Sequence, residues 1–158
     1  MRSESTKNWL GVGLLALAAL QTVAPVRRYV FPPPFHDDFP AAGLDPLYNE
    51  HLIPDVGGLG LALTGMLYFA TRVLDSKVVL PAVIGYSICA AAHFTFHVRH
   101  FDHSSLLDAV AVGTGLGIDV VLALVLVRVG RRAQRTASAA VPGSETGIRR
   151  SISEGRLA

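Results

Sequence analysis

The sequence has few charged residues and a single cysteine. Asp, Glu, Lys and Arg make up 16% of its 158 residues, whereas 51% are hydrophobic; a water-soluble domain usually carries about 25% charged residues. One thiol cannot form an internal disulfide, so we expect Cys89 to be a small buried hydrophobic residue. The sequence also lacks a nucleotide-binding glycine loop, a nucleophile elbow and a CxxC pair. These absences argue against ATPase, serine hydrolase and dithiol redox activities.

Four apolar stretches dominate what is there. They cover residues 9–26, 52–74, 78–96 and 105–129. A helix needs about 20 apolar residues to cross a bilayer, because its backbone groups must be satisfied within the segment itself. We therefore predict an all-α, polytopic membrane protein whose four transmembrane helices form an up-down bundle. The chain has room for one membrane domain, residues 1–129.

Basic residues gather in the segments that an even number of spans places on one face. These are the N-terminal segment, the link with Arg72 and Lys77, and the segment after the fourth span. The positive-inside rule then places both termini in the cytoplasm of a multi-pass cell-membrane protein, although Arg27 and Arg28 argue the other way. Residues 130–158, rich in Arg, Ser, Ala and Gly, are predicted to be a basic, disordered cytoplasmic tail.

The net charge indicates which classes of partner the chain favours. A formal charge of +2 with the basic residues beside a membrane span does not favour nucleic acid. The expected partner is the lipid bilayer, and a homodimer or a second membrane protein remains open.

The first loop is predicted to be stiff and to lie on the outer membrane surface. Residues 31–35 read FPPPF, and consecutive prolines favour extended polyproline geometry. Asp45-Pro46 resembles a helix start. We therefore expect a short interfacial helix from Pro46 to about Ile53, after which Pro54 either opens the second span or kinks a continuous helix.

Histidines and carboxylates gather at the predicted outer end of the bundle. All six histidines fall on this side. Three of them share one face of the third helix, at spacing i, i+4, i+7: His93, His97 and His100. Facing elements contribute four more groups: Glu50, His51, Asp55 and Asp108. We expect these side chains to converge at the mouth of the bundle.

This constellation is open to three interpretations. Imidazole and carboxylate suit Zn(II), Fe(II) or Mn(II). Candidate metal ligands are His51, His93, His97 and His100. The same region could instead bind a ligand or handle protons. Candidates for that role are Glu50, Asp55, Asp108 and Asp119. The third interpretation is plain helix capping, since Asp55 and Asp108 lie in first helical turns. A bis-histidine haem is the weakest fit, because the first and fourth spans contain no histidine.

Asp119 stands apart because it lies in the middle of the fourth span. It should face the bundle interior and either be protonated or pair with a polar neighbour. The candidate neighbours are Thr64, Tyr86, Ser87 and Thr114, with Gln21 as a further one.

Residues 46–58 read PLYNEHLIPDVGG; they follow Phe39-Pro40 and precede the three histidines of the third helix. They resemble a group of small four-span bacterial membrane proteins, mostly actinobacterial, with a YNEHL-x-xDVG signature and a late HxxxHxxH pattern. The resemblance covers about residues 25–130 and implies a four-helix membrane bundle but no substrate. Where that pattern has arginine before the aspartate, this chain has Pro54.

The function hypotheses therefore belong to different classes. The first is an extracytoplasmic pocket that handles a metal or protons for a small or lipidic ligand, with enzymatic activity left open. The second is a non-catalytic accessory or partner subunit. The third, transport, would make Asp119 indispensable.

Overall fold

The computed structural model describes residues 2–38, 42, 48–103 and 105–139. Throughout these residues the regular structure is helical. The elements are α1 (Arg2–Val30), α2 (Pro32–Asp38), α3 (Leu52–Val73), α4 (Ser76–Arg99), the 3-10 turn η2 (Phe101–His103) and α5 (Leu106–Ala139). The four long helices are each long and apolar enough to cross a membrane. The chain is therefore a multi-pass, helical membrane protein, as its apolar stretches predict.

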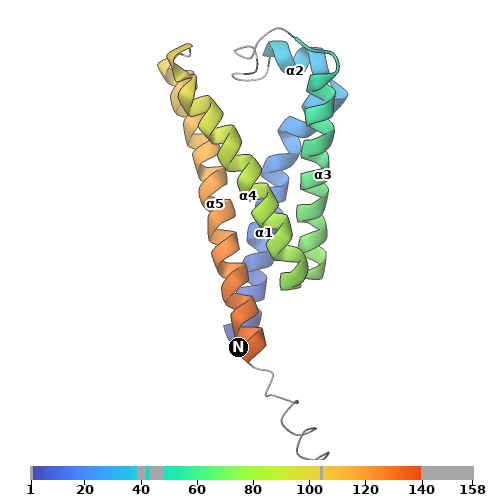
Figure 1. The fold of residues 1–158 in the computed structure, drawn as a ribbon, viewed down its shortest axis with the longest axis vertical. Helices are drawn as coiled ribbons and strands as arrows, with labels where there is room; N and C mark the ends of the chain where they lie inside the picture. The colour runs from blue at the N-terminus through green and yellow to red at the C-terminus, as the bar shows by residue number, and fades with distance from the viewer. Residues whose placement is uncertain (1, 39–41, 43–47, 104, 140–158) are drawn as a thin grey trace, which may run out of the picture.

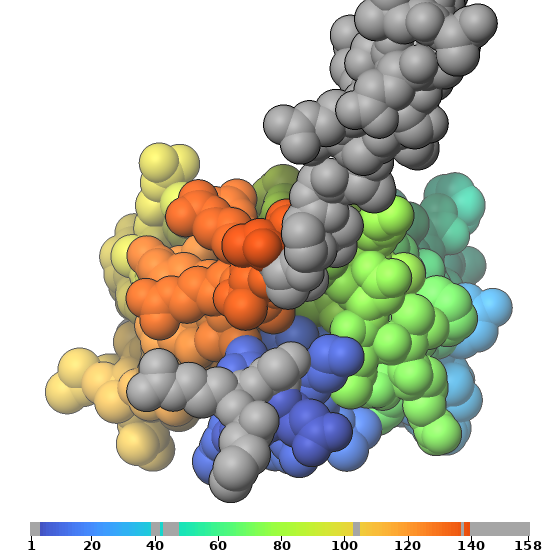
Figure 2. All heavy atoms as spheres, turned by 90° about the horizontal axis from the view of Figure 1, so that it is seen from below, coloured from blue at the N-terminus to red at the C-terminus, as the bar shows by residue number. Residues whose placement is uncertain are grey.

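The long helices are arranged in two pairs. Helix α1 packs against α3, and α4 packs against α5. The two pairs lie close together at the end that carries the N-terminus and diverge toward the end that carries α2 and η2 (Figure 1). Viewed from that closed end, the start of α1 and the last part of α5 lie side by side (Figure 2).

The buried core occupies the closed half of the bundle. Its largest fully buried side chains are Leu14, Leu17, Leu67, Val79, Val83 and Tyr86. Along α4 the buried residues stop at Ala90, and residues 91–100 are all exposed or half-buried. The open half therefore lacks an equivalent side-chain core among the described residues.

Two glycines let α1 and α3 approach closely. A Cβ added at Gly57 would lie 2.8 Å from the backbone nitrogen of Tyr29, and one added at Gly60 would lie 2.7 Å from Cγ of Pro25. Real Cβ atoms do not come this close to other heavy atoms. The pairing of α1 with α3 therefore depends on glycine at both positions, as small residues permit close helix packing in lipid.

The proline-rich segment differs from its predicted extended conformation. Residues Pro32–Asp38 form helix α2, which follows α1 almost without interruption. The Phe31 amide donates to the Arg27 carbonyl, and the Phe35 amide donates to the Phe31 carbonyl, both at 2.9 Å. The three prolines occupy the first turn of α2, where amide groups have no intrahelical acceptor and their absence costs nothing.

The predicted interfacial helix is also not observed where the structure describes it. Pro46 and Leu47 lie outside the described residues, and the chain becomes helical at Leu52. The Asn49 side-chain oxygen instead accepts hydrogen bonds from the amides of His51 and Leu52, at 3.0 and 2.9 Å. Pro54 lies in the first turn of α3, so it opens the second span, one of the two alternatives considered.

Helix α5 is longer than the predicted fourth span. It continues through Ala139, so residues 130–139 are helical although the sequence composition suggested a disordered tail. Helices can extend beyond the apolar layer wherever water satisfies their outer backbone groups. The rest of the predicted tail, residues 140–158, lies outside the described part of the chain.

Candidate ligand-binding groove

A groove separates the two helix pairs at their open end. Its outer pocket has a volume of about 470 Å³ and lies between α2, the start of α3 and the end of α4. Its inner pocket, about 550 Å³, extends down the bundle to α5. The two pockets share six lining residues: Arg28, Phe35, Ala42, Val56, His93 and His97. They therefore form one continuous groove.

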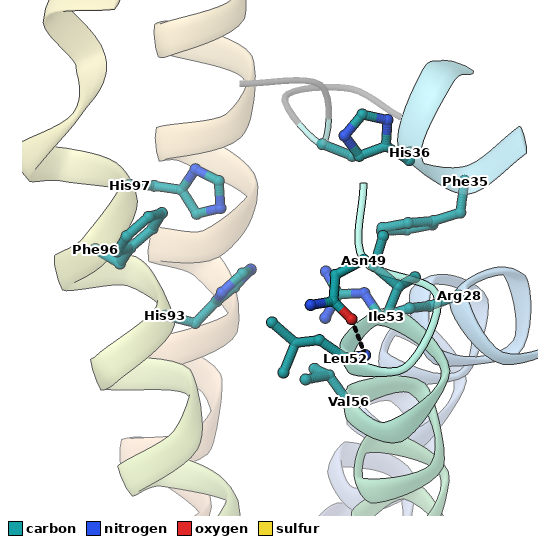
Figure 3. A pocket seen from close by; sticks show the side chains of 11 residues that line it. Arg28, Phe35, His36, Asn49, Leu52, Ile53, Val56, His93, Phe96 and His97 are labelled. Carbon is teal, nitrogen blue, oxygen red and sulfur yellow. Dashed lines mark hydrogen bonds between the residues drawn. The ribbon is translucent and has the colours of Figure 1, made fainter. Parts of the chain in front are cut away.

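Nitrogen-bearing side chains converge on the outer pocket. His93 and His97 project from α4 toward Arg28 and Asn49 on the opposite wall, with His36 above them (Figure 3). The Arg28 guanidinium lies 4.6 Å from the centroid of the Phe35 ring, at a distance suited to a cation–π contact. None of the described residues lining this pocket is acidic. One fixed positive charge, the Arg28 guanidinium, and three imidazoles that can donate hydrogen bonds therefore line the outer pocket.

The two α4 histidines lie against each other, as their i, i+4 spacing predicts. The ring centroids of His93 and His97 are 4.7 Å apart at an angle of 86°. Phe96 contacts His97 edge to face, with centroids 5.6 Å apart. Both imidazoles line the groove.

His36 adds a third imidazole from α2. Its Nδ1 lies 3.1 Å from Oδ1 of Asp37, and its ring packs edge to face on Tyr48 at 5.7 Å. Its Nε2 is buried and makes no hydrogen bond within the described part of the chain. A buried polar nitrogen without a partner at the edge of a pocket is a candidate contact for a ligand.

A polar cluster from three helices lies at the deep end of the inner pocket. The Tyr86 hydroxyl on α4 lies 2.9 Å from Oε1 of Gln21 on α1 and also hydrogen-bonds Oδ2 of Asp119 on α5. Oδ1 of Asp119 is buried and has no hydrogen-bond partner among the described residues. We call Gln21, Tyr86 and Asp119 the deep polar cluster. Asp119 therefore faces the interior and bonds directly to Tyr86, one of the partners expected from the sequence, whereas Gln21 is joined to it only through Tyr86.

Two other predicted partners of Asp119 bond elsewhere. The Thr64 hydroxyl donates to the Gly60 carbonyl at 2.9 Å, and the Ser87 hydroxyl donates to the Val83 carbonyl at 2.7 Å. Both bonds are to the same helix, four residues back, which is the local acceptor that such hydroxyls commonly find.

The carboxylates predicted at the mouth do not line the groove. His51 and Asp55 form an i, i+4 pair at 3.3 Å whose side chains are 90% and 58% exposed. Glu50 is exposed in the turn before α3. Asp108 exchanges hydrogen bonds with Ser105 at the start of α5, which is the capping arrangement that the sequence left open.

His100 is likewise separated from the other candidate ligands. Its Nδ1 lies 2.7 Å from the Phe96 carbonyl oxygen, and its ring stacks on Phe96 at 4.3 Å. Within the described ranges, no group of three or more His, Cys, Asp and Glu side chains is placed to hold a metal ion. Of the predicted set His51, His93, His97 and His100, the structure brings only His93 and His97 together on the groove.

Sequence reasoning overlooked Arg28 and misjudged Cys89. Arg27 and Arg28, in the last turn of α1, figured only as charges against the predicted topology. Basic residues on the face that the positive-inside rule leaves poor in them were the available signal for a positive pocket. Cys89, expected to be buried, is exposed and lines the inner pocket.

Comparisons of the chain with models of protein families, with curated proteins and with solved structures find no match. The functional argument therefore rests on the geometry and chemistry of the groove.

Proposed function

We propose that this membrane protein binds an amphiphilic lipid with an anionic headgroup, the headgroup in the outer pocket and the apolar chain along the inner pocket. The observation that carries this proposal is the set of hydrogen-bond donors in the outer pocket: one guanidinium and three imidazoles, with no acidic residue among the described lining. An anionic oxygen is the complementary partner for such a surface.

The apolar walls favour a lipid over a small soluble anion. Leu20 on α1, Leu59 on α3 and Ile118 on α5 line the inner pocket, and all three side chains are exposed. In a bilayer these side chains meet acyl chains, so the inner pocket is open sideways to the hydrocarbon. A ligand that partitions into the membrane reaches such a groove without crossing water.

The headgroup chemistry follows from the donors. Arginine carries five N–H donors in a planar fork that matches the oxygens of a phosphate or carboxylate, and it stays charged at all physiological pH values. Neutral imidazole donates one N–H and protonated imidazole donates two. Arg28, His93 and His97 would therefore bind a phosphate or carboxylate group whatever the protonation state of the histidines.

The positive-inside rule supports a headgroup site on the outer face of an up-down bundle. Arg128, Arg131, Arg132 and Arg135 lie in the part of α5 that reaches the closed end. With that end and both termini in the cytoplasm, the outer pocket faces the opposite leaflet. The ligand then belongs to the outer leaflet of the cell membrane.

Lipid co-purification tests the proposal. The full chain is extracted from membranes in a mild detergent and examined by native mass spectrometry beside a His93→Gln/His97→Gln variant. We expect a retained anionic lipid on the wild type and loss of most of it from the double variant. Retention of neutral lipids only, or equal retention of anionic lipid by both proteins, would contradict the proposal.

Cys89 provides a second readout from within the groove. Because it lines the inner pocket, a bound lipid should slow its alkylation by a small maleimide. Lysophosphatidylglycerol, a single-chain anionic lipid, serves as the added probe. The matched control is Ile88→Cys in a Cys89→Ala background, since Ile88 is 68% exposed and lines neither pocket. Protection at position 89 alone supports the proposal, and equal rates with and without the lipid at position 89 oppose it.

A further inference from the structure

The deep polar cluster has too many acceptors for its hydrogens. The Tyr86 hydroxyl carries one hydrogen, yet it contacts Oε1 of Gln21 and Oδ2 of Asp119. With Asp119 ionised, both of these oxygens need that one hydrogen. With Asp119 protonated, the acid donates to the Tyr86 oxygen, and Tyr86 donates to Gln21, so every contact has its hydrogen.

The ionised form requires a rearrangement. If Asp119 releases its proton, Tyr86 must turn its hydrogen toward Oδ2, and the Gln21 amide must rotate to present its NH₂ group to the Tyr86 oxygen. Both arrangements use the same three side chains and differ by one proton. The cluster therefore has the composition of a site that binds and releases a single proton.

The surroundings of the cluster supply no cation in contact with it. Within the described residues, no ion pair joins Asp119 to a basic group at 4.0 Å or less. The groups that share the inner pocket are Arg28 and Gln21 from α1, Tyr86, Cys89, His93 and His97 from α4, and only glycine and apolar residues from α3. Arg28 lies seven residues beyond Gln21 along α1, a rise of about 10 Å.

We propose that the deep polar cluster is a proton-binding site whose occupancy is coupled to lipid binding in the groove. This inference rests on the proposed function. The apolar chain of a bound lipid would cover the Asp119 carboxyl and remove water from it. Burying a carboxylate that has no cation beside it is costly, whereas a hydrogen-bonded neutral acid is tolerated. The lipid therefore binds best to the protonated cluster, and by linkage the bound lipid strengthens proton binding.

Infrared difference spectroscopy detects the proton directly. A protonated carboxyl has a C=O stretching band that a carboxylate lacks. We expect a band in the wild type that disappears at alkaline pH, is absent from Asp119→Asn and shifts in frequency in Tyr86→Phe, where the hydroxyl is lost. Absence of an Asp119-dependent band at every pH would overturn the proton site. Asp119→Asn retains a donor NH₂ group toward Tyr86, so the cluster keeps its hydrogen bonds in this variant.

Binding of lysophosphatidylglycerol at different pH values tests the coupling. Its phosphodiester keeps its charge over the range used, so only the protein titrates. The affinity should fall by up to about tenfold per pH unit as the cluster loses its proton, because one proton is linked to one ligand. His93 and His97 also lose charge in the neutral range. The experiment is therefore repeated in the His93→Gln/His97→Gln background, where the slope due to Asp119 should remain and Asp119→Asn should abolish it.

The two proposals fail in different ways. Lipid binding with the same pH slope in wild type and Asp119→Asn would overturn the coupling and leave the proposed function intact. An Asp119-dependent infrared band without lipid binding at any pH would overturn the proposed function and the coupling together, with the proton site retained.

Discussion

The Tyr86 hydroxyl on α4 lies 2.9 Å from Oε1 of Gln21 on α1, so one side chain of the α4/α5 pair bonds directly to the α1/α3 pair. Tyr86 is 1% exposed, and a buried polar partner that loses its bond is destabilised by about 1–3 kcal/mol. Tyr86→Phe should therefore lower the free energy of unfolding in detergent by that amount, measured by chemical denaturation. Tyr68→Phe is the control, because the Tyr68 hydroxyl is exposed and lies 3.3 Å from Thr22. Equal effects of the two substitutions would contradict the assigned role of Tyr86.

The close approach of α1 and α3 predicts a strong dependence on side-chain size. Gly57→Ala would place a Cβ 2.8 Å from the Tyr29 backbone nitrogen, and overpacking of this kind usually costs about 1–3 kcal/mol. Gly65→Ala on the same helix meets nothing within 4 Å and should be neutral or stabilise by up to about 1 kcal/mol, since alanine favours helix. Thermal unfolding of the two variants side by side measures the difference. A Gly57→Ala protein as stable as the wild type would mean that α1 and α3 do not approach this closely at Gly57.

Arg28 should dominate headgroup binding. A charged hydrogen bond contributes about 1.5–3 kcal/mol, so Arg28→Gln should weaken binding of lysophosphatidylglycerol by at least about tenfold. Arg28→Lys keeps the charge but loses the planar fork. Its affinity for the lipid should therefore lie between those of the wild type and Arg28→Gln. Arg27→Gln is the matched control, because Arg27 is adjacent in the same helical turn and does not line either pocket. An equal loss of lipid affinity in Arg28→Gln and Arg27→Gln would point to general surface charge instead of a headgroup site.

The carboxylates at the mouth should affect stability and leave lipid binding unchanged. The Ser105 hydroxyl accepts a hydrogen bond from the Asp108 amide and donates one to the Asp108 carboxylate. Ser105→Ala removes this helix cap and should lower the free energy of unfolding by about 1 kcal/mol. His51→Ala removes an exposed pair, and such pairs contribute about 0.2–1 kcal/mol. The same binding and unfolding measurements test both variants. A large loss of lipid affinity in either would place the headgroup site nearer to α5 or to the start of α3.

Metal removal should have no effect on the groove. Within the part of the chain that the structure describes, the histidines and carboxylates do not form a cluster of three ligands. We therefore expect EDTA treatment to leave lipid affinity and unfolding temperature unchanged. Elemental analysis of wild type beside His93→Ala/His97→Ala checks the same point. Near-stoichiometric zinc, iron or manganese that disappears in the variant would establish a metal site at His93 and His97 and contradict this prediction.

The features predicted correctly from the sequence depend on residues close together in the chain. The apolar stretches specify the four long helices because a bilayer imposes one length on all of them. The i, i+4 spacing places His93 beside His97, and a carboxyl in the middle of a span must face the interior, as Asp119 does. Each of these inferences needs only helical geometry and the cost of burying charge.

The features that were missed depend on how distant segments meet. Three prolines in succession suit polyproline geometry or a first helical turn, and the position of α1 decides between them. The groove depends on the divergence of the two helix pairs, which no local pattern encodes. Arg28 and Cys89 line the groove because of this divergence, so their place in it could not be predicted from local sequence. The mouth carboxylates were grouped with the histidines because the predicted topology places them at the same end of the bundle, but Asp55 and Asp108 make local contacts outside the groove.

Burial along α4 ends at Ala90, and this boundary bears on how the protein should be handled. A lipid that fills the groove would supply the interior contacts missing from the open half, so in thermodynamic terms the occupant is part of the folded state. Stability then rises with the free lipid concentration, by about 2.7 kcal/mol at a hundredfold excess over Kd. Extensive delipidation during purification would accordingly yield a protein that unfolds at lower temperature, although its sequence and helices are unchanged.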